Sequence, residues 1–262
     1  MNGRPVTTVS FTADQGVGTL TLDRPDAGNA VNLELAQDLH TAVLAAEADR
    51  SVKVVVIRGA GRSFCVGGDL KAFSARDDLP AHLREVTAHL HAAIAALARM
   101  DAPIVVGVQG SAAGAGLGLA VGGDIVIATE SARFVVAYTK IGLNPDGGTS
   151  FLLPRLVGLR RAQEITLLNT PVDAASACEI GLVTRVVADE ALDTEVEATA
   201  RALAAGAKRA QGEAKRLLRT SLDESLALHL EAEAAAIVRS AERADAREGI
   251  TAFLEKRSPQ FE

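Results

Sequence analysis

The sequence predicts an α/β protein with a parallel sheet and a helical C-terminal region. Through residue 188, β-branched runs alternate with helical patterns, and this alternation is typical of parallel strands joined by right-handed crossovers. From about Asp189 the pattern changes to helices rich in Ala, Glu, Arg and Leu. We therefore expect residues 1–188 to form the functional core and residues 189–262 to form a helical appendage.

The composition narrows the class of protein. The chain has 262 residues, 48% of them apolar, so a large core is possible, and its net charge of −6 argues against nucleic acid or an anionic membrane as a partner. Cys65 and Cys178 are too few for a disulfide framework, and no His/Asp/Glu cluster has metal-ligand spacing, so we expect no metal. No signal peptide or membrane-length apolar run occurs, so we expect a cytoplasmic protein without a membrane partner.

The first elements follow from short-range patterns. Residues 6–11 and 16–22 have strand composition around the polar turn 12–15, which predicts a hairpin. A loop at 24–30 precedes a helix that begins at the N-cap Asn32 and runs to about Ala48.

The next segment contains a strand, a glycine turn and a long helix. Residues 52–58 read as a buried strand, and Gly67-Gly68 allows a turn whose amides point into a cavity. We expect a loop at 71–80, because it has mixed charge and ends in Pro80. Apolar residues between Leu83 and Leu97 then recur at helical spacing.

The stretch 105–127 organises the chain. It reads as strand, tight turn, short helix and strand, with only small side chains from Gly110 to Gly116. A helix that begins on such residues offers free backbone N–H groups to an oxygen that develops negative charge. The alternative is that small residues only allow close packing.

The remaining patterns are a short apolar run, a turn-rich loop and several helices. Residues 134–136 are apolar, the loop spans 141–149, and helices are expected at 152–156 and 160–169. The C-terminal helices break at Gly206 and near residues 221–223, and their apolar faces are expected to cover the core or a neighbouring subunit.

Three motifs together carry a family resemblance: FCVGGDL at 64–70, GSAAGAG at 110–116 and IGLNPDGG at 141–148. Their order and spacing resemble the crotonase (enoyl-CoA hydratase/isomerase) superfamily, and further segments resemble its enoyl-CoA isomerases and phenylacetyl-CoA ring-epoxide isomerases. The resemblance implies a spiral of ββα turns with a C-terminal helical trimerisation region, hence a homotrimer or dimer of trimers. It also implies an acyl-CoA thioester substrate, no cofactor beyond its CoA moiety, and oxyanion donors at the amides of Gly68 and Ala115.

Departures from the family pattern bear on the reaction. The two glutamates of the hydratases fall on Gly118 and Tyr138, so the groups that hold and activate water are missing. Asp146 falls on the acidic position of the isomerases and dehalogenases, where it would act as a base beside the thioester. Its alternative role is that of a turn residue in Asn-Pro-Asp-Gly-Gly.

His91 adds a second possibility. In the dehalogenase branch, a histidine at this place activates water while an aromatic residue at the place of Tyr138 helps fix the substrate beside a nucleophilic aspartate. The set His91, Tyr138 and Asp146 resembles that arrangement, with tyrosine in place of the usual tryptophan. The alternative for His91 is a structural or solvated side chain.

Other residues receive binding or structural assignments. Asp124 is expected to tie down backbone amides, and Cys65 to be a small core residue. Lys256 could equally belong to a solvated charged end. By resemblance, the CoA moiety would contact Ala27, Gly28, Ala30, Val66, Asp69, Leu70, Phe253 and Lys256, the last two from the same chain or from an adjacent subunit.

The sequence therefore predicts an acyl-CoA isomerase that shifts a double bond or isomerises a ring epoxide, with Asp146 as base and Tyr138 shaping the acyl pocket. One alternative is an acyl-CoA or aryl-CoA hydrolase or dehalogenase that uses Asp146 and His91. Another is a non-catalytic acyl-CoA binder. A 2-enoyl-CoA hydratase ranks below these.

Overall fold

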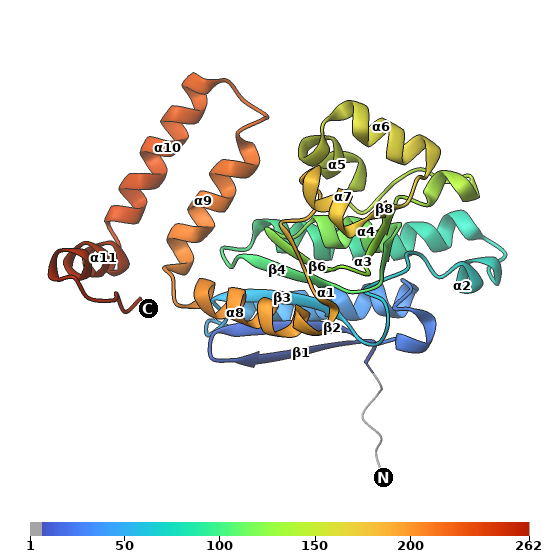
Figure 1. Ribbon diagram of the computed structural model, residues 1–262, viewed down its shortest axis with the longest axis horizontal. Helices are drawn as coiled ribbons and strands as arrows, with labels where there is room; N and C mark the ends of the chain where they lie inside the picture. Colours follow the sequence, from blue (N-terminus) through green and yellow to red (C-terminus); the bar gives the residue numbers. More distant parts are fainter. Residues whose placement is uncertain (1–6, 262) are drawn as a thin grey trace, which may run out of the picture.

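The computed structural model describes residues 7–261, which form two sheets with helices packed around them (Figure 1). The larger sheet has the strand order β1-β2-β3-β4-β6-β9. Only β1 and β2 pair antiparallel, and every other neighbouring pair in this sheet is parallel, as predicted. Its strands are β1 (Val9–Asp14), β2 (Val17–Leu22), β3 (Val54–Gly59), β4 (Ile104–Val108), β6 (Ile125–Thr129) and β9 (Arg185–Val187).

Strand β3 shows why the sheet is covered on both sides. Val55 and Ile57 belong to the main core, whereas Val54 and Val56 belong to a second apolar cluster with helix α8 (Leu192–Ala204). Successive side chains of a strand point to opposite faces, so a strand buried on both faces must be apolar throughout.

Helices α1 (Leu33–Ala48) and α3 (Leu79–Arg99) pack together over the main core. The predicted N-cap of α1 is confirmed, because the Asn32 side chain accepts a hydrogen bond from the Leu35 amide at 2.9 Å. This cap satisfies one of the amides that a helix start leaves without a partner.

The expectation of a loop at 71–80 is wrong for most of that segment. Helix α2 (Leu70–Ser74) occupies its first half, and α3 already begins at Leu79. Both helices have an aspartate N-cap: Asp69 accepts from the Ala72 amide and Asp78 accepts from the Ala81 amide. Pro80 stands in the first turn of α3, where its missing N–H costs nothing.

The predicted hairpin is present, but its turn lies further along the sequence than expected. Strand β1 continues to Asp14, so the turn lies at Gln15 and Gly16 rather than at 12–15. Both turn residues have positive φ, +47° and +84°, a conformation that glycine supplies without strain. The predicted start of the first strand, Val6, lies outside the described residues.

The smaller sheet has the order β5-β7-β8 and lies beside the predicted glycine-rich turn. Strand β5 (Ser111–Ala113) occupies part of that turn, and helix α4 (Ala115–Val121) follows it directly. Helix α5 begins at Thr149, three residues earlier than expected. The other elements here are β7 (Arg133–Val135), the 3-10 helix η2 (Tyr138–Ile141), α5 (Thr149–Val157), α6 (Leu159–Leu168), β8 (Val172–Asp173) and α7 (Ala174–Glu179).

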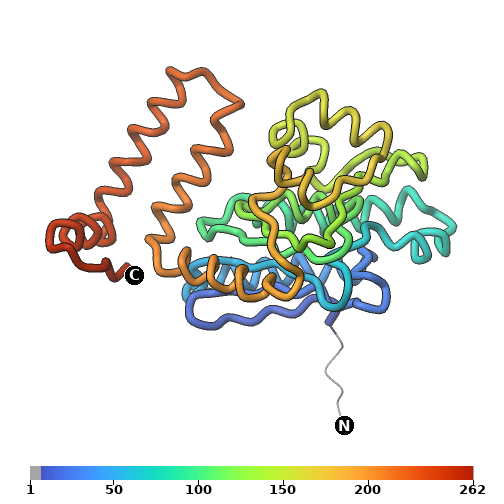
Figure 2. The backbone as a smooth tube through the Cα atoms, viewed as in Figure 1, coloured from blue at the N-terminus to red at the C-terminus, as the bar shows by residue number. Residues whose placement is uncertain are grey.

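The C-terminal helices divide into two groups. Helix α8 lies on the large sheet, whereas α9 (Lys208–Thr220) and α10 (Leu226–Ala241) form a pair that projects from the body and leads to α11 (Ala244–Glu255) (Figures 1 and 2). The predicted breaks at Gly206 and near 221–223 are confirmed. The division at residue 188 stays a prediction, and α8 packs with the sheet that precedes it.

A buried ion pair fastens α9 to the body. The Lys215 side chain is 5% exposed, and its Nζ lies 2.8 Å from Oδ2 of Asp124. The same Nζ donates to the carbonyl oxygens of Leu97 and Ala102. Asp124 also accepts a hydrogen bond from the Ile104 amide at 2.8 Å, which confirms its structural role.

The projecting helices expose large apolar side chains. They are Leu218, Leu222, Leu226, Leu228, Leu230, Ile237, Val238, Ile250, Phe253 and Leu254. Among the described residues, no helix combines the length and the apolar character that crossing a membrane requires.

Candidate active site

A cavity of about 200 Å³ brings four of the predicted site residues together. Gly68, Ala115, Tyr138 and Asp146 all line it, although they come from four separate segments of the chain. The rest of its lining is mostly apolar and consists of Val31, Phe73, Leu83, Val86, Thr87, Leu90, Leu143 and Asn144. The cavity is therefore an apolar pocket with a few polar groups, as small-molecule sites commonly are.

The Gly68 amide is directed away from its neighbouring strand segment. Val31 donates to the Gly67 carbonyl at 2.7 Å and accepts from the Asp69 amide at 2.9 Å. Backbone groups alternate in direction along an extended segment, so the N–H of Gly68 faces the other side. No described residue accepts a hydrogen bond from it, which leaves this donor free for a ligand.

The Ala115 amide is the second free donor. Gly114 precedes it with φ +52° and ψ −123°, a backbone conformation that side-chain-bearing residues rarely adopt. Gly114 donates to the Val135 carbonyl, whereas the amide of Ala115, the first residue of α4, has no acceptor within the described part of the chain. Amides in the first helical turn lack intrahelical partners, so this donor too can serve a ligand.

Each carboxylate oxygen of Asp146 has a polar neighbour. The Tyr138 hydroxyl donates a short hydrogen bond to Oδ1, and His91 Nε2 lies 3.2 Å from Oδ2. The Thr149 amide donates to the Asp146 carbonyl at the start of α5, so the residue also completes a turn. The structural and chemical interpretations of Asp146 are therefore compatible.

Tyr138 is mostly buried, and its phenol stays protonated. Burial is the main reason that its pKa lies well above the ordinary value of 10.0, and the negative charge of Asp146 raises the pKa further. Tyr138 therefore acts as a hydrogen-bond donor to Asp146 rather than as a second anion.

His91 contacts Asp146 from outside the cavity. It lies on α3, its side chain is 49% exposed, and it is not part of the cavity lining. Its Nε2 also accepts a hydrogen bond from the Gly147 amide at 3.2 Å. An amide N–H can only donate, so this bond favours the neutral tautomer whose proton is on Nδ1.

Comparisons with known proteins identify the family of the chain. A sequence model of the family Enoyl-CoA hydratase/isomerase matches residues 12–262. The chain belongs to this family. The crotonase resemblance read from three short motifs, and the fold that it implied, are thereby confirmed.

Relatives within the family carry out different reactions. The 1,2-epoxyphenylacetyl-CoA isomerase of Escherichia coli (strain K12) is 39% identical over 250 residues, 95% of each chain. The 4-chlorobenzoyl coenzyme A dehalogenase-2 of an Arthrobacter species is 35% identical over 209 residues, 79% of this chain and 76% of the dehalogenase. The crystal structure of an enoyl-CoA hydratase from Polaromonas sp. JS666 superposes with a TM-score of 0.92 at 33% identity, covering 97% of this chain and 99% of that one.

The position assigned to the first hydratase glutamate has no room for a side chain. A Cβ placed on Gly118 would lie 2.7 Å from the Gly147 carbonyl oxygen and 2.7 Å from Thr149 Oγ1. Real Cβ atoms essentially never come so close to another heavy atom, so a glutamate here would require the 147–149 segment to move. This member of the family thus lacks both the glutamate and the space for it.

Six residues predicted to meet the CoA moiety gather at one rim of the site. Val66 donates to the Gly28 carbonyl at 3.0 Å, and Arg24 links the segment to α2 through its ion pair with Asp69 at 3.0 Å. Arg24 also donates a short hydrogen bond to the Ala30 carbonyl. Val66 and Leu70 are exposed here, and Ala27 lies in the adjoining 3-10 helix η1 (Pro25–Ala27).

Phe253 and Lys256, the other two predicted CoA contacts, do not lie at the CoA rim of their own chain. Phe253 lies on α11 with 83% of its surface exposed, and Lys256 is the C-cap of that helix. Figure 1 places α11 and α2 at opposite ends of the molecule. Their contribution from a second copy stays a prediction.

Cys65 is a core residue, as expected. It is fully buried, and burial raises the pKa of its thiol to about 11, which keeps it protonated and unreactive.

The apolar lining was largely missed from the sequence. Phe73 falls within the loop expected at 71–80, and Val86 and Leu90 fall within the apolar helix face expected between Leu83 and Leu97. The N-cap pattern Asp69-Leu70-Lys71-Ala72 was a signal that could have located α2 and therefore Phe73.

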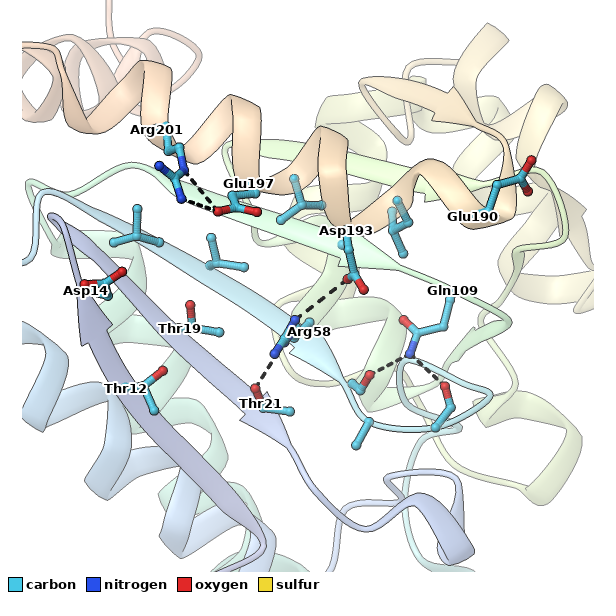
Figure 3. Close-up of a pocket in the computed structure, with 18 of the residues that line it drawn as sticks. Thr12, Asp14, Thr19, Thr21, Arg58, Gln109, Glu190, Asp193, Glu197 and Arg201 are labelled. Carbon is cyan, nitrogen blue, oxygen red and sulfur yellow. Dashed lines mark hydrogen bonds and ion pairs between the residues drawn. The ribbon is translucent and has the colours of Figure 1, made fainter.

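A larger groove of about 670 Å³ lies elsewhere, along β2, β3 and α8 (Figure 3). Its lining contains none of the predicted site residues. Its two arginines are already engaged: Arg58 lies 3.8 Å from Asp193, and Arg201 donates to Glu197 at 3.0 Å. We therefore assign the chemistry to the smaller cavity, where free donors and a carboxylate converge.

Proposed function

We propose that this protein is an acyl-CoA isomerase. It shifts a double bond or isomerises a ring epoxide by transferring a proton through a thioester enolate. The observation that carries the proposal is the convergence of two free backbone donors and the Asp146 carboxylate on one apolar cavity. Such an arrangement suits a reaction in which a carbonyl oxygen gains negative charge while a neighbouring carbon loses a proton.

Each group has a separate task in this mechanism. The Gly68 and Ala115 amides hold the thioester oxygen, and one donor of this type contributes about 3 to 4 kcal/mol to the transition state. Asp146 removes a proton from the carbon next to the thioester and returns a proton to another carbon. Tyr138 fixes Oδ1 of Asp146, so that Oδ2 is the oxygen left for proton transfer.

Two further observations favour isomerisation over hydration. Gly118 and Tyr138 replace the glutamates that would hold and activate water, and the first of these positions has no space for a side chain. The 39% identical relative is named as an isomerase of a ring epoxide on an aryl-acetyl-CoA. We include that substrate class beside unbranched 3-enoyl-CoA thioesters.

The proposal is tested by giving the purified protein three substrates in parallel: a 3-enoyl-CoA, 1,2-epoxyphenylacetyl-CoA and a 2-enoyl-CoA. Chromatography of the products should show isomerisation of one of the first two and no hydration of the third. Hydration as the fastest reaction would overturn the proposal. Acyl-CoA binding without conversion of any of the three would favour a non-catalytic binder.

A second candidate is an aryl-CoA dehalogenase or hydrolase. It is favoured by the contact between His91 and Asp146 and by the 35% identity to a 4-chlorobenzoyl coenzyme A dehalogenase. Here Asp146 would attack the substrate, and His91 would activate the water that hydrolyses the covalent intermediate. Continuous chloride release from 4-chlorobenzoyl-CoA by the wild type, reduced in His91→Ala to at most one equivalent per site with accumulation of the covalent intermediate, would support this candidate.

We also propose that copies of this chain assemble as a trimer or a dimer of trimers in the cytoplasm. The exposed apolar side chains of α9, α10 and α11 support an interface, since isolated surfaces rarely present such a group of large apolar residues. A neighbour would then place Phe253 and Lys256 near the CoA rim of another copy. Light scattering of the purified protein tests the assembly.

A further inference from the structure

We propose that His91 is the proton outlet of the site: it exchanges the proton taken up by Asp146 with solvent, and so determines whether the substrate's own proton is returned. This inference rests on the proposed isomerase function and adds a positioning residue to it. It is carried by the geometry of three atoms, Nε2 of His91, Oδ2 of Asp146 and the amide nitrogen of Gly147.

Nε2 of His91 lies 3.2 Å from Oδ2 of Asp146 and 3.2 Å from the amide nitrogen of Gly147. The Gly147 amide can only donate, so Nε2 presents a lone pair, and an ionised Asp146 presents another lone pair to the same atom. Two acceptors at this distance repel each other unless a proton lies between them. The contact becomes a hydrogen bond once Asp146 has taken a proton from the substrate.

The opposite oxygen of Asp146 cannot serve as the outlet. Oδ1 accepts the short hydrogen bond from Tyr138, whose raised pKa keeps that phenol protonated. Tyr138 is mostly buried in the cavity wall, whereas His91 has 49% of its side chain exposed and lies outside the cavity lining. The Asp146 side chain is itself 26% exposed, and of its two partners His91 is the one that can relay a proton between Oδ2 and solvent.

In a 3-enoyl thioester, the proton can follow two routes from C2 to C4. The bond between C2 and hydrogen breaks, its electron pair enters the enolate, and the proton forms a bond to Oδ2 of Asp146. In direct return, that proton bonds to C4 while the enolate electrons form the new double bond. In the outlet route, the proton moves to Nε2 of His91, the Nδ1 proton leaves to water, and a solvent proton later returns through the same atoms to C4.

Both routes give the same 2-enoyl product, but they leave different amounts of deuterium at C4. A 3-enoyl-CoA that carries deuterium at C2 is converted in ordinary water, and mass spectrometry measures the deuterium retained at C4 of the 2-enoyl product. A blank without enzyme corrects for spontaneous loss from C2. We expect the wild-type protein to lose most of the transferred deuterium and His91→Gln to retain most of it.

Glutamine is the informative substitution. Its side-chain amide offers a hydrogen-bond acceptor for the Gly147 N–H and a donor for Oδ2 of Asp146, but it does not take up a proton. A purely structural role of His91 would change the rate or the binding constant without changing the retained fraction. His89→Gln, on the same helix and in ring contact with His40, is the matched control and should behave like wild type.

The outcomes separate this inference from the proposed function. Conversion with equal deuterium retention in wild type and His91→Gln overturns the outlet alone, as does complete retention in wild type. No conversion by the wild-type protein overturns the enoyl isomerase function, and the outlet falls with it. Deuterium retention that is higher in His91→Gln than in the wild type and in His89→Gln supports both the isomerase function and the proton outlet.

Discussion

Gly118 and Gly147 are packed so closely that a Cβ on Gly118 would lie 2.7 Å from the Gly147 carbonyl oxygen. The contact joins helix α4, which begins with the Ala115 donor, to the loop that carries Asp146. The missing side chain therefore helps to set the distance between two halves of the site.

We predict that Gly118→Ala destabilises the fold by roughly 1–3 kcal/mol, since overpacking forces the backbone to shift. Thermal unfolding measures the effect. Gly249→Ala is the matched control within a helix: its Cβ would lie an ordinary 3.4 Å from Phe261, so it should not destabilise. Equal unfolding temperatures for the two variants would contradict the packing argument.

Tyr138 can be titrated on its own, because the chain has one tyrosine and no tryptophan. Burial and the Asp146 charge raise its pKa, so the phenolate absorbance should not appear near pH 10, where a free tyrosine ionises. Its neutral form stabilises the fold below that pH, and this contribution is lost as the pH rises above about 10, because only the unfolded chain then ionises. Asp146→Asn should lower the pKa of Tyr138 part of the way, since burial remains. A titration indistinguishable from free tyrosine would show that the pair is not formed.

Gly68 is packed against the ring of Phe73. A Cβ on Gly68 would lie 2.6 Å from Cε2 of the Phe73 ring. We predict that Gly68→Ala lowers kcat by up to about 100-fold, because a displaced donor no longer meets the oxyanion. Gly68→Ala combined with Phe73→Leu should recover part of the loss. Steady-state kinetics of both variants tests this, and an unimpaired Gly68→Ala enzyme would show that the added Cβ does not displace the donor.

Lys215 and Asp124 are predicted to be coupled in stability. Lys215→Met removes the nearest cation of Asp124 and should lower the free energy of unfolding by less than the roughly 3–5 kcal/mol of a fully buried pair, because Arg219 still lies 3.8 Å from Asp124. Adding Asp124→Asn should recover part of that cost, because no uncompensated charge then remains. Lys140→Met, at an exposed position, serves as the control. Denaturant unfolding of the wild type, Lys215→Met, Asp124→Asn, the double variant and the control gives the five values, and strict additivity would argue against the pair.

Patterns within one element predicted much of the fold. The doubly buried strand β3 was recognisable because both of its faces are apolar, and Asn32 marked the start of α1. The N-caps Asp69 and Asp78 are equally local signals, and they favour helices over the loop expected at 71–80.

The arrangement of the site depends on contacts that no local pattern contains. His91 and Asp146 lie 55 positions apart, and their contact requires α3 to pack beside the loop before α5. Likewise, Gly118 reads as a small helical residue until Gly147 is seen against it. Family motifs could supply the candidates, but only tertiary packing decides which atoms meet.

The most direct test of the central claim is the turnover of Asp146→Asn on the substrate that the wild-type protein isomerises, with acyl-CoA affinity measured on the same preparation. Asparagine keeps the size of the side chain and can still accept the Tyr138 hydrogen bond, so binding should persist. We predict a loss of about 10²–10⁴-fold in kcat with little change in Kd, because the base is gone. A variant that binds and isomerises like the wild type would contradict the role of Asp146.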